Sequence, residues 1–171
     1  QRSPDALTIW TTLYTCQPRT DLWGGWNVRT LQGHDSQVYS LSISAEGARA
    51  VSGSRGKNIK VWDVSSGDCL HTFQGNVPIR GIRTRGHFSM VLSVHLRDDA
   101  RTAASGGAFN KVKLWNTDKW EHIRTLSGHQ DDVHSVYLDS EAIYVLSGSS
   151  DKTLKLWCVR TGQCLRTFEG H

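Results

Sequence analysis

Apolar and polar residues alternate with a period of two in three short segments, each of which ends on a tryptophan. The segments are Ile59–Trp62, Val112–Trp115 and Leu154–Trp157. A period of two is typical of a β-strand with one buried face, whereas a helix would repeat its apolar positions every three or four residues. No stretch of the chain shows a sustained helical period. The pattern therefore predicts an all-β protein.

The same features recur around each of these tryptophans at fixed distances. A Ser-Gly pair begins ten residues before the tryptophan, and a Gly-His pair ends 28 residues before it. The serines and histidines at these positions are Ser52, Ser105, Ser147, His34, His87 and His129. Another short segment of strand-forming residues follows each tryptophan. The chain is therefore a tandem repeat in which each unit contains about four short strands joined by tight turns.

This order of features resembles the WD40 repeat family, whose units run from a Gly-His pair to a Trp-Asp pair and fold into four-stranded blades of a β-propeller. The resemblance covers Leu31 to His171. The aspartate of the Trp-Asp pair is present at Asp63 and is replaced by Asn116 and Cys158 in the other two units. The resemblance implies an all-β fold of about four WD40-type propeller blades, of which the first is incomplete.

The spacing of the histidines predicts where the blades begin. His87 and His129 are 42 residues apart, but His34 and His87 are 53 apart, and deleting residues 76–86 removes the difference. The expected parts are an incomplete first blade at 1–33, blades at 34–75, 87–128 and 129–171, and an insertion between blades at 76–86. The insertion is either a basic binding loop or a tolerated surface excursion, and its lack of a clear pattern favours the excursion.

Each blade of a propeller packs both faces on neighbouring blades, so about four blades are expected to leave two faces uncovered. The sequence therefore predicts a partial propeller, or one part of a ring that further chain or another copy completes. The first alternative makes the chain a fragment or isoform of a longer propeller protein. The second makes it a self-associating protein that closes a ring.

Composition restricts the compartment and the partners. The four cysteines lie in no C-x-x-C or zinc-type spacing, which favours free thiols in an intracellular protein, cytoplasmic or nuclear. The net charge of +4 falls to +1 without the three arginines of the insertion, so a basic nucleic-acid face is not expected. No apolar run is long enough for a membrane span. The histidines lie one blade apart, and neither a metal site nor a cofactor is expected.

The tryptophans outside the repeat are not expected to form a base-stacking platform for nucleic acid. Trp23 is assigned to the incomplete first blade. Trp120 stands in a turn before an outer strand, where it is expected to be exposed.

A histidine, a serine and an aspartate within one repeat unit are the residue types of a hydrolase triad. The resemblance instead implies that they join the tryptophan in a buried, structural hydrogen-bond chain, and no nucleophile-elbow motif G-x-S-x-G is present. The predicted tetrad is His129, Ser147, Asp151 and Trp157. Gly56 and Phe109 replace the aspartate in the other units, leaving the partial tetrads His34, Ser52, Trp62 and His87, Ser105, Trp115. The chain is not expected to be an enzyme.

The resemblance also implies where a partner would bind. WD40 proteins often contact partners through the start of the inner strand and the residue before the turn aspartate. The positions that correspond are Gln37, Tyr39, Arg55, Met90, Leu92, Ala108, Asp132, His134 and Ser150. The expected function is a protein–protein interaction scaffold. The alternative is a nucleic-acid-binding or catalytic module that uses one rim of the propeller.

Overall fold

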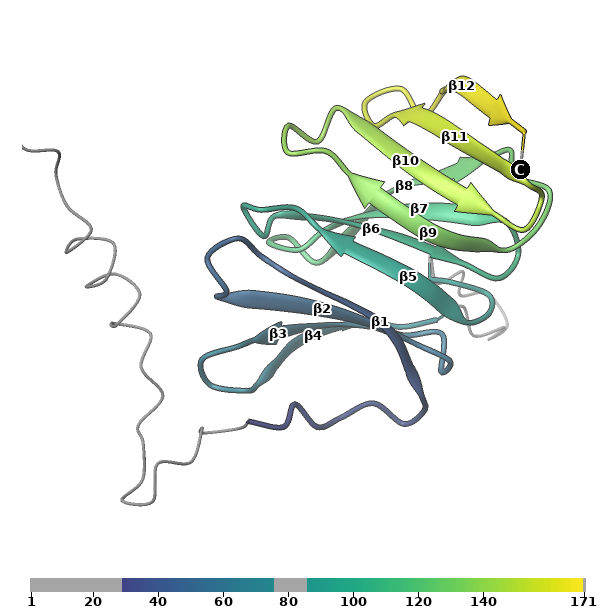
Figure 1. The fold of residues 1–171 in the computed structure, drawn as a ribbon. Helices are drawn as coiled ribbons and strands as arrows, with labels where there is room; N and C mark the ends of the chain where they lie inside the picture. The colour runs from purple at the N-terminus through teal and green to yellow at the C-terminus, as the bar shows by residue number, and fades with distance from the viewer. Residues whose placement is uncertain (1–28, 76–85, 171) are drawn as a thin grey trace, which may run out of the picture. The chain divides into compact units, whose positions relative to one another are not determined.

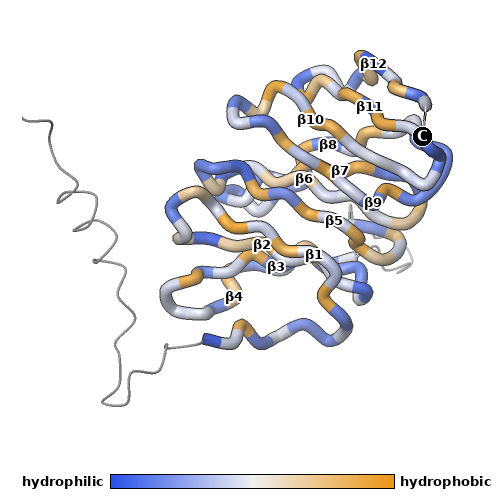
Figure 2. Tube along the Cα trace, in the orientation of Figure 1, coloured by the Kyte–Doolittle hydropathy of each residue, from blue (hydrophilic) through white to orange (hydrophobic). Residues whose placement is uncertain are grey.

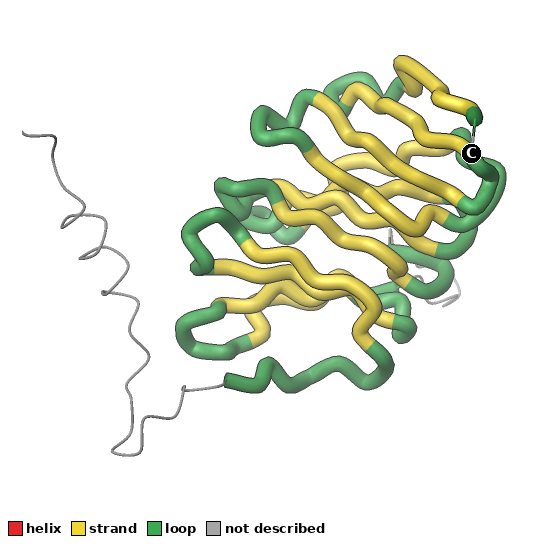
Figure 3. Tube along the Cα trace, in the orientation of Figure 1, coloured by secondary structure: helices red, strands yellow, loops and turns green. Residues whose placement is uncertain are grey.

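The structure, a computed structural model, describes residues 29–75 and 86–170. The chain divides into two units, Gln1–Thr30 and Leu31–His171. Within the described residues of the second unit there are twelve strands and no helix (Figure 3). Residues 1–28 of the predicted first blade, Trp23 among them, the insertion up to residue 85 and His171 lie outside the described residues.

The strands form three antiparallel sheets of four strands each, and every strand pairs with its neighbours in sequence (Figure 1). Because the sequence predicts an incomplete first blade, we number these sheets blades two, three and four. Blade two contains β1 (Val38–Ile43), β2 (Arg49–Ser54), β3 (Ile59–Asp63) and β4 (Cys69–Phe73). Blade three contains β5 (Val91–Leu96), β6 (Thr102–Gly107), β7 (Lys111–Asn116) and β8 (Glu121–Ser127). Blade four contains β9 (Val133–Leu138), β10 (Tyr144–Ser149), β11 (Thr153–Cys158) and β12 (Cys164–Glu169).

The third and fourth strands of each blade share one irregularity. Their register shifts at the repeat tryptophan, between Val61 and Trp62 in blade two, and at the matching residues of the other blades. Such a shift marks a β-bulge, which bends a strand and re-aims its side chains. The three tryptophans therefore leave their strands in the same local geometry.

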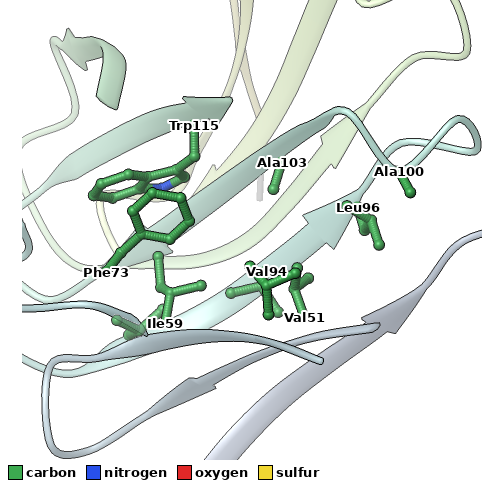
Figure 4. Close-up of a cluster of buried hydrophobic side chains, with 10 residues drawn as sticks. Val51, Ile59, Phe73, Val94, Leu96, Ala100, Ala103 and Trp115 are labelled. Atoms are coloured by element: carbon green, nitrogen blue, oxygen red, sulfur yellow. The ribbon is translucent and has the colours of Figure 1, made fainter. Parts of the chain in front are cut away.

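Apolar side chains between neighbouring blades form two cores. The first core joins blades two and three, and Figure 4 shows Phe73 and Ile59 of blade two facing Trp115 of blade three. The second core joins blades three and four around Leu114 and Trp157. The inner strands β1, β5 and β9 lie side by side in chain order (Figure 1). Blade three is therefore covered on both faces.

The exposed state predicted for Trp120 is wrong. Its ring stacks on His71 of blade two, with ring centres 4.9 Å apart and planes 18° apart, and it packs partly buried against the first core. Trp120 has a positive φ of 57°, which turns its side chain toward the neighbouring blade. The contact joins two blades, so a reading of the turn alone could not find it.

The two outer faces of the stack are uncovered in the described part of the chain. On blade two, Val38, Leu41 and Ile43 are 49%, 73% and 52% exposed. On blade four, Leu146 and Phe168 are each 38% exposed. Figure 2 shows that hydrophobic positions continue along the strands of these outer blades. The described sheets do not close into a ring, so the predicted all-β partial propeller is confirmed.

Candidate functional site

Blade four contains a continuous chain of hydrogen bonds that runs from its tryptophan to its turn aspartate. The indole N–H of Trp157 donates to Oγ of Ser147 over 2.8 Å, and Nε2 of His129 lies 2.8 Å from the same oxygen. Nδ1 of His129 lies 2.7 Å from Oδ2 of Asp151. The structure thus brings together all four side chains of the predicted tetrad.

Asp151 makes the most hydrogen bonds of the four tetrad residues. Burial disfavours its charged form, but hydrogen bonds from the Thr153 hydroxyl, the Gln130 amide and the His129 ring outweigh that effect and hold the pKa of Asp151 well below its ordinary value. The carboxylate is therefore charged at neutral pH. Ser147 is only 1% exposed, so a substrate cannot reach its hydroxyl for nucleophilic attack.

Blades two and three keep the tryptophan–serine–histidine part of the chain. Their serines lie 2.8 Å from the tryptophan nitrogens and 2.6–2.7 Å from the histidine nitrogens. The residues are Trp62, Ser52 and His34 in blade two and Trp115, Ser105 and His87 in blade three. At the aspartate position of blade three, Phe109 points outward and is 64% exposed. A phenyl ring offers the histidine no acceptor there.

Blade two fills the missing aspartate position in another way. A Cβ atom added to Gly56 would lie 2.5 Å from Oδ1 of Asp35, so the Asp35 carboxylate occupies the space of the missing side chain. It does not replace the hydrogen bond, because Nδ1 of His34 has no hydrogen-bond partner among the residues that the structure describes. Burial and the charge of Lys60 lower the pKa of His34, against a smaller opposing effect of Asp35. The nearby Asp35 carboxylate thus offsets only part of the lowering of the His34 pKa.

His87 is buried in blade three and is only 2% exposed. Burial, with the charges of Lys113 and His122, lowers its pKa from 6.5 to about 3. The unfolded chain therefore binds a proton at this position between pH 6.5 and 3, whereas the folded chain does not. Its contribution to stability is present above pH 6.5 and is lost as the pH falls toward 3.

We expect acidification from pH 7 to pH 5 to lower the free energy of unfolding by about 2 kcal/mol through His87 alone. The measurement is urea unfolding at a series of pH values, followed by tryptophan fluorescence. The matched variant is His87→Asn, whose side chain does not titrate, and its stability should fall less over the same interval. Equal slopes for the two proteins would show that His87 is not buried in its neutral form.

One rim of the stack gathers the start of each inner strand next to the residue that follows each second strand. The same backbone hydrogen bond fixes this pairing in every blade, at 2.8–3.1 Å. The bonded pairs are Arg55 N to Gln37 O, Ala108 N to Met90 O, and Ser150 N to Asp132 O. We call this edge, together with Tyr39, Leu92, Phe109 and His134, the rim site. It includes all the positions predicted for partner contacts.

Contacts within the rim site cross from blade to blade. The Tyr39 hydroxyl of blade two lies 3.8 Å from Sδ of Met90 in blade three, and it also donates to the Gln37 side chain. The backbone N–H of Phe109 in blade three donates to Asp132 of blade four. The rim site is therefore a continuous surface rather than three separate patches.

Most of the predicted contact residues are accessible. Tyr39, Gln37, Arg55 and His134 are exposed, and Met90, Leu92 and Asp132 are partly exposed. Ala108 is buried and offers no side chain to a partner. In blade four the ring of His134 lies 2.7 Å from the Ser150 hydroxyl, so these two residues present one fixed polar group.

Phe109 was missed as a contact residue because the sequence identified it only as a lost aspartate. Its positive φ of 74° turns the phenyl ring outward beside a hollow of about 390 Å³. The hollow is lined by Ala108, Phe109, Asn110, Gln130, Asp131 and Asp132. An aromatic residue in place of a repeat aspartate is the signal that could have revealed it.

Two other kinds of site receive no support within residues 29–75 and 86–170. These residues contain no cluster of three or more His, Cys, Asp or Glu side chains that could hold a metal ion. Nor do they form a helix that is long and apolar enough to cross a membrane.

Stacked four-stranded meanders, each with a Trp–Ser–His hydrogen-bond chain at the same place, are blades of a β-propeller. Comparison with known proteins identifies the kind of blade. The family model "WD domain, G-beta repeat" matches residues 25–63 and 120–158. These two stretches of the chain are WD40 repeats.

Solved structures of WD40 proteins superpose well on the chain. The structure of U3-55K matches with a TM-score of 0.77 and 27% identity, covering 84% of this chain and 42% of that one. The crystal structure of the RRP9 WD40 repeats gives a TM-score of 0.75 at the same identity and coverage.

Curated relatives match a shorter stretch. Nuclear distribution protein PAC1 of Arthroderma otae is 34% identical over 113 residues, which are 60% of this chain and 22% of PAC1. U3 small nucleolar RNA-interacting protein 2 of Homo sapiens is 26% identical over 104 residues, 61% of this chain and 22% of that protein. The chain thus spans about a fifth of the length of these relatives.

Proposed function

We propose that the chain is a non-catalytic protein-interaction scaffold and that the rim site holds its partner. WD40 proteins are generally non-catalytic scaffolds that bind other proteins. The observation that carries the proposal for this chain is the series formed by exposed Tyr39, partly exposed Met90 and exposed Phe109, which crosses from blade two to blade three on one rim. Aromatic residues, methionine and arginine are enriched at protein interfaces, and Arg55 stands beside this series.

Charge at the rim site favours a protein partner over nucleic acid. Asp131 and Asp132 line the hollow beside Phe109 and would repel phosphates. A partner segment with an apolar side chain for the hollow and a basic side chain for these carboxylates fits best. One relative carries the name U3 small nucleolar RNA-interacting protein 2, so association with a ribonucleoprotein through its protein component is compatible with the proposal.

The tetrad side chains support a structural rather than a catalytic role. The histidine and serine of blade four are 2% and 1% exposed, and those of blade three are similarly buried. An intracellular location, cytoplasmic or nuclear, agrees with cysteines 69, 158 and 164, which form no disulfide. That the chain is a fragment or isoform of a longer propeller protein stays a prediction.

Substituting Tyr39 and Arg55 together with alanine tests the rim site. Peptides selected from a display library on the wild-type chain should bind the double variant at least about 10-fold more weakly, because interface hot spots are dominated by such residues. Isothermal titration calorimetry with the selected peptides measures the change. The matched control is Ile143→Ala, an exposed aliphatic residue at the opposite edge of blade four, which should bind as the wild type does.

If the double variant bound the selected peptides with unchanged affinity, the rim site would not be where the partner binds. Selection of nucleic acid in a parallel experiment, with binding lost on the same two substitutions, would favour the nucleic-acid alternative instead.

A further inference from the structure

Neighbouring blades contact each other through two different faces, which we name by chain order. The trailing face of a blade packs on the next blade, and the leading face packs on the previous one. In blade two the trailing face consists of Val51, Gly53, Ile59, Val61 and Phe73, and all but the glycine belong to the first core. The same positions in blade three are Ala104, Gly106, Val112, Leu114 and Leu126, whose larger members belong to the second core.

Within residues 29–75 and 86–170, one copy of each face is uncovered. The trailing face of blade four has Leu146, Gly148, Leu154, Leu156 and Phe168 at the positions that are buried in blades two and three. The leading face of blade two has Val38, Leu41, Ile43, Ala50 and Trp62 at the positions buried in blades three and four. Leu41 is 73% exposed on this face, which also contains an apolar hollow of about 340 Å³. Both halves of the internal interface are therefore uncovered in the part of the chain that the structure describes.

A glycine on each trailing face receives two aliphatic side chains from the next inner strand. A Cβ on Gly53 would lie 2.6 Å from Val91 and 2.9 Å from Val94, and Gly106 meets Val133 and Val136 at the same distances. Because both contacts repeat without change, the fit is a property of the repeat rather than of one junction.

The two uncovered faces have the same small and large residues at these positions as the internal junctions. Gly148 keeps the small residue, but the nearest side-chain atom that a Cβ there would meet is Leu154 of its own blade, at 3.1 Å. On blade two, Val38 and Leu41 occupy the positions of the two valines that pack on such a glycine. Blade four therefore has the space, and blade two has the side chains that fill such a space.

Polar groups repeat across the junctions as well. Oγ of Ser40 accepts the backbone N–H of Val94 over 3.0 Å, and Oγ of Ser93 accepts that of Val136 over 3.1 Å. Ser135 stands at the same position in blade four and is exposed. It would accept the backbone N–H of Leu41 if blade two followed blade four.

An arginine contact occurs at the junction between blades three and four but not at the junction between blades two and three. Arg124 of blade three donates to the carbonyls of Thr161 and Arg160 in blade four, where its stem lies close to Gly162. The same position is His71 in blade two, which faces Trp120, but it is Arg166 in blade four. The residue that corresponds to Gly162 on blade two is Gly67, with a φ of 85°. Arg166 of blade four and the turn at Gly67 of blade two could therefore make the contact that Arg124 makes with the turn at Gly162.

We propose that the trailing face of blade four binds the leading face of blade two in a second copy of the chain. The contact is head-to-tail, so it uses two different surfaces and leaves one of each free on a pair of copies. Its apolar centre would repeat the two cores already inside the chain, with the glycine contact, the serine acceptor and the arginine contact around it. The rim site takes no part in it.

Sedimentation velocity of the full 171-residue chain over a range of concentrations tests the contact. The wild-type mass should rise with concentration, whereas Leu41→Asp and Leu146→Asp, each alone, should remain monomeric at concentrations about 100-fold higher. Every head-to-tail contact needs one leading face and one trailing face. Copies of a single variant therefore cannot associate with one another, because one of the two faces is altered in every copy. Mixed together, the two variants should form a one-to-one complex through the two intact faces.

Controls separate the proposed contact from non-specific association and from misfolding. Ile123→Asp, an exposed aliphatic position on blade three, should associate as the wild type does. Arg166→Ala removes an exposed arginine whose guanidinium carbon lies 5.1 Å from the ring centre of Phe168. It should weaken association while leaving the thermal midpoint of the monomer close to that of the wild type. Circular dichroism and melting curves verify that each aspartate variant is folded.

Three results would overturn the proposal. They are a wild-type chain that stays monomeric throughout, a Leu41→Asp variant that still self-associates, and a mixture of the two variants that does not recombine. Peptide binding at the rim site is measured separately, so failure of this contact and failure of the scaffold function are distinguishable.

Discussion

Ser105→Ala is expected to lower the free energy of unfolding by about 2 to 5 kcal/mol, since it leaves two buried polar groups without a partner. The Ser105 hydroxyl accepts the indole N–H of Trp115 over 2.8 Å and lies 2.7 Å from Nε2 of His87. Both rings are only 2% exposed, so water cannot replace the lost oxygen without opening the blade. Each unsatisfied group costs about 1 to 3 kcal/mol.

Ser52→Ala is the matched control for this prediction. Its hydroxyl makes the same two contacts, at 2.8 and 2.6 Å, but its histidine, His34, is only partly buried and can turn to water. The loss of stability should therefore be smaller than for Ser105→Ala. Urea unfolding of both variants at pH 7.5 measures the difference, and equal losses would show that burial does not set the cost of this hydrogen-bond chain.

Gly106→Val is expected to destabilise the chain by about 3 kcal/mol through overpacking between blades three and four. A Cβ at this position already comes within 2.6 Å of Val133 and 2.9 Å of Val136. These atoms belong to β9, so a side chain at Gly106 must move a whole strand rather than one rotamer. Chemical unfolding followed by tryptophan fluorescence measures the loss.

Gly148→Val is the matched control, because Gly148 occupies the same position in blade four, on a face that no other described strand covers. The nearest atom to an added Cβ is the end of the flexible Leu154 side chain at 3.1 Å. Valine also favours a strand conformation over glycine, so the change in stability should be within about 1 kcal/mol. Both variants are compared at a protein concentration where the wild type is monomeric. A loss as large as that of Gly106→Val would contradict the assignment of an open face.

The repeat made the fold predictable. Tryptophans, serines and histidines at equal intervals identify positions that perform one structural task in every unit, and the period of two identifies strands. A single strand such as Ile59–Asp63 would have been ambiguous alone, but three copies in register exclude a coincidence. The tetrad residues were predictable for the same reason, since the intervals fix which side chains meet.

Contacts that occur at only one junction were not predictable. The stacking of Trp120 on His71 joins two blades and depends on a residue with positive φ. The outward turn of Phe109 also depends on its backbone conformation. Neither contact recurs, so no comparison between the units of one sequence could reveal it. The place of Phe109 in the rim site therefore needed coordinates, whereas the other rim positions and the blades that present them did not.

The carboxylate of Asp35 occupies the space that a side chain at Gly56 would need. Its Oδ1 lies 2.5 Å from where the first carbon of that side chain would be placed. An aspartate introduced at position 56 would have to displace the Asp35 side chain, and the two like charges would repel each other. Residues 35 and 56 are thus coupled, so a substitution at one of them changes the cost of a substitution at the other.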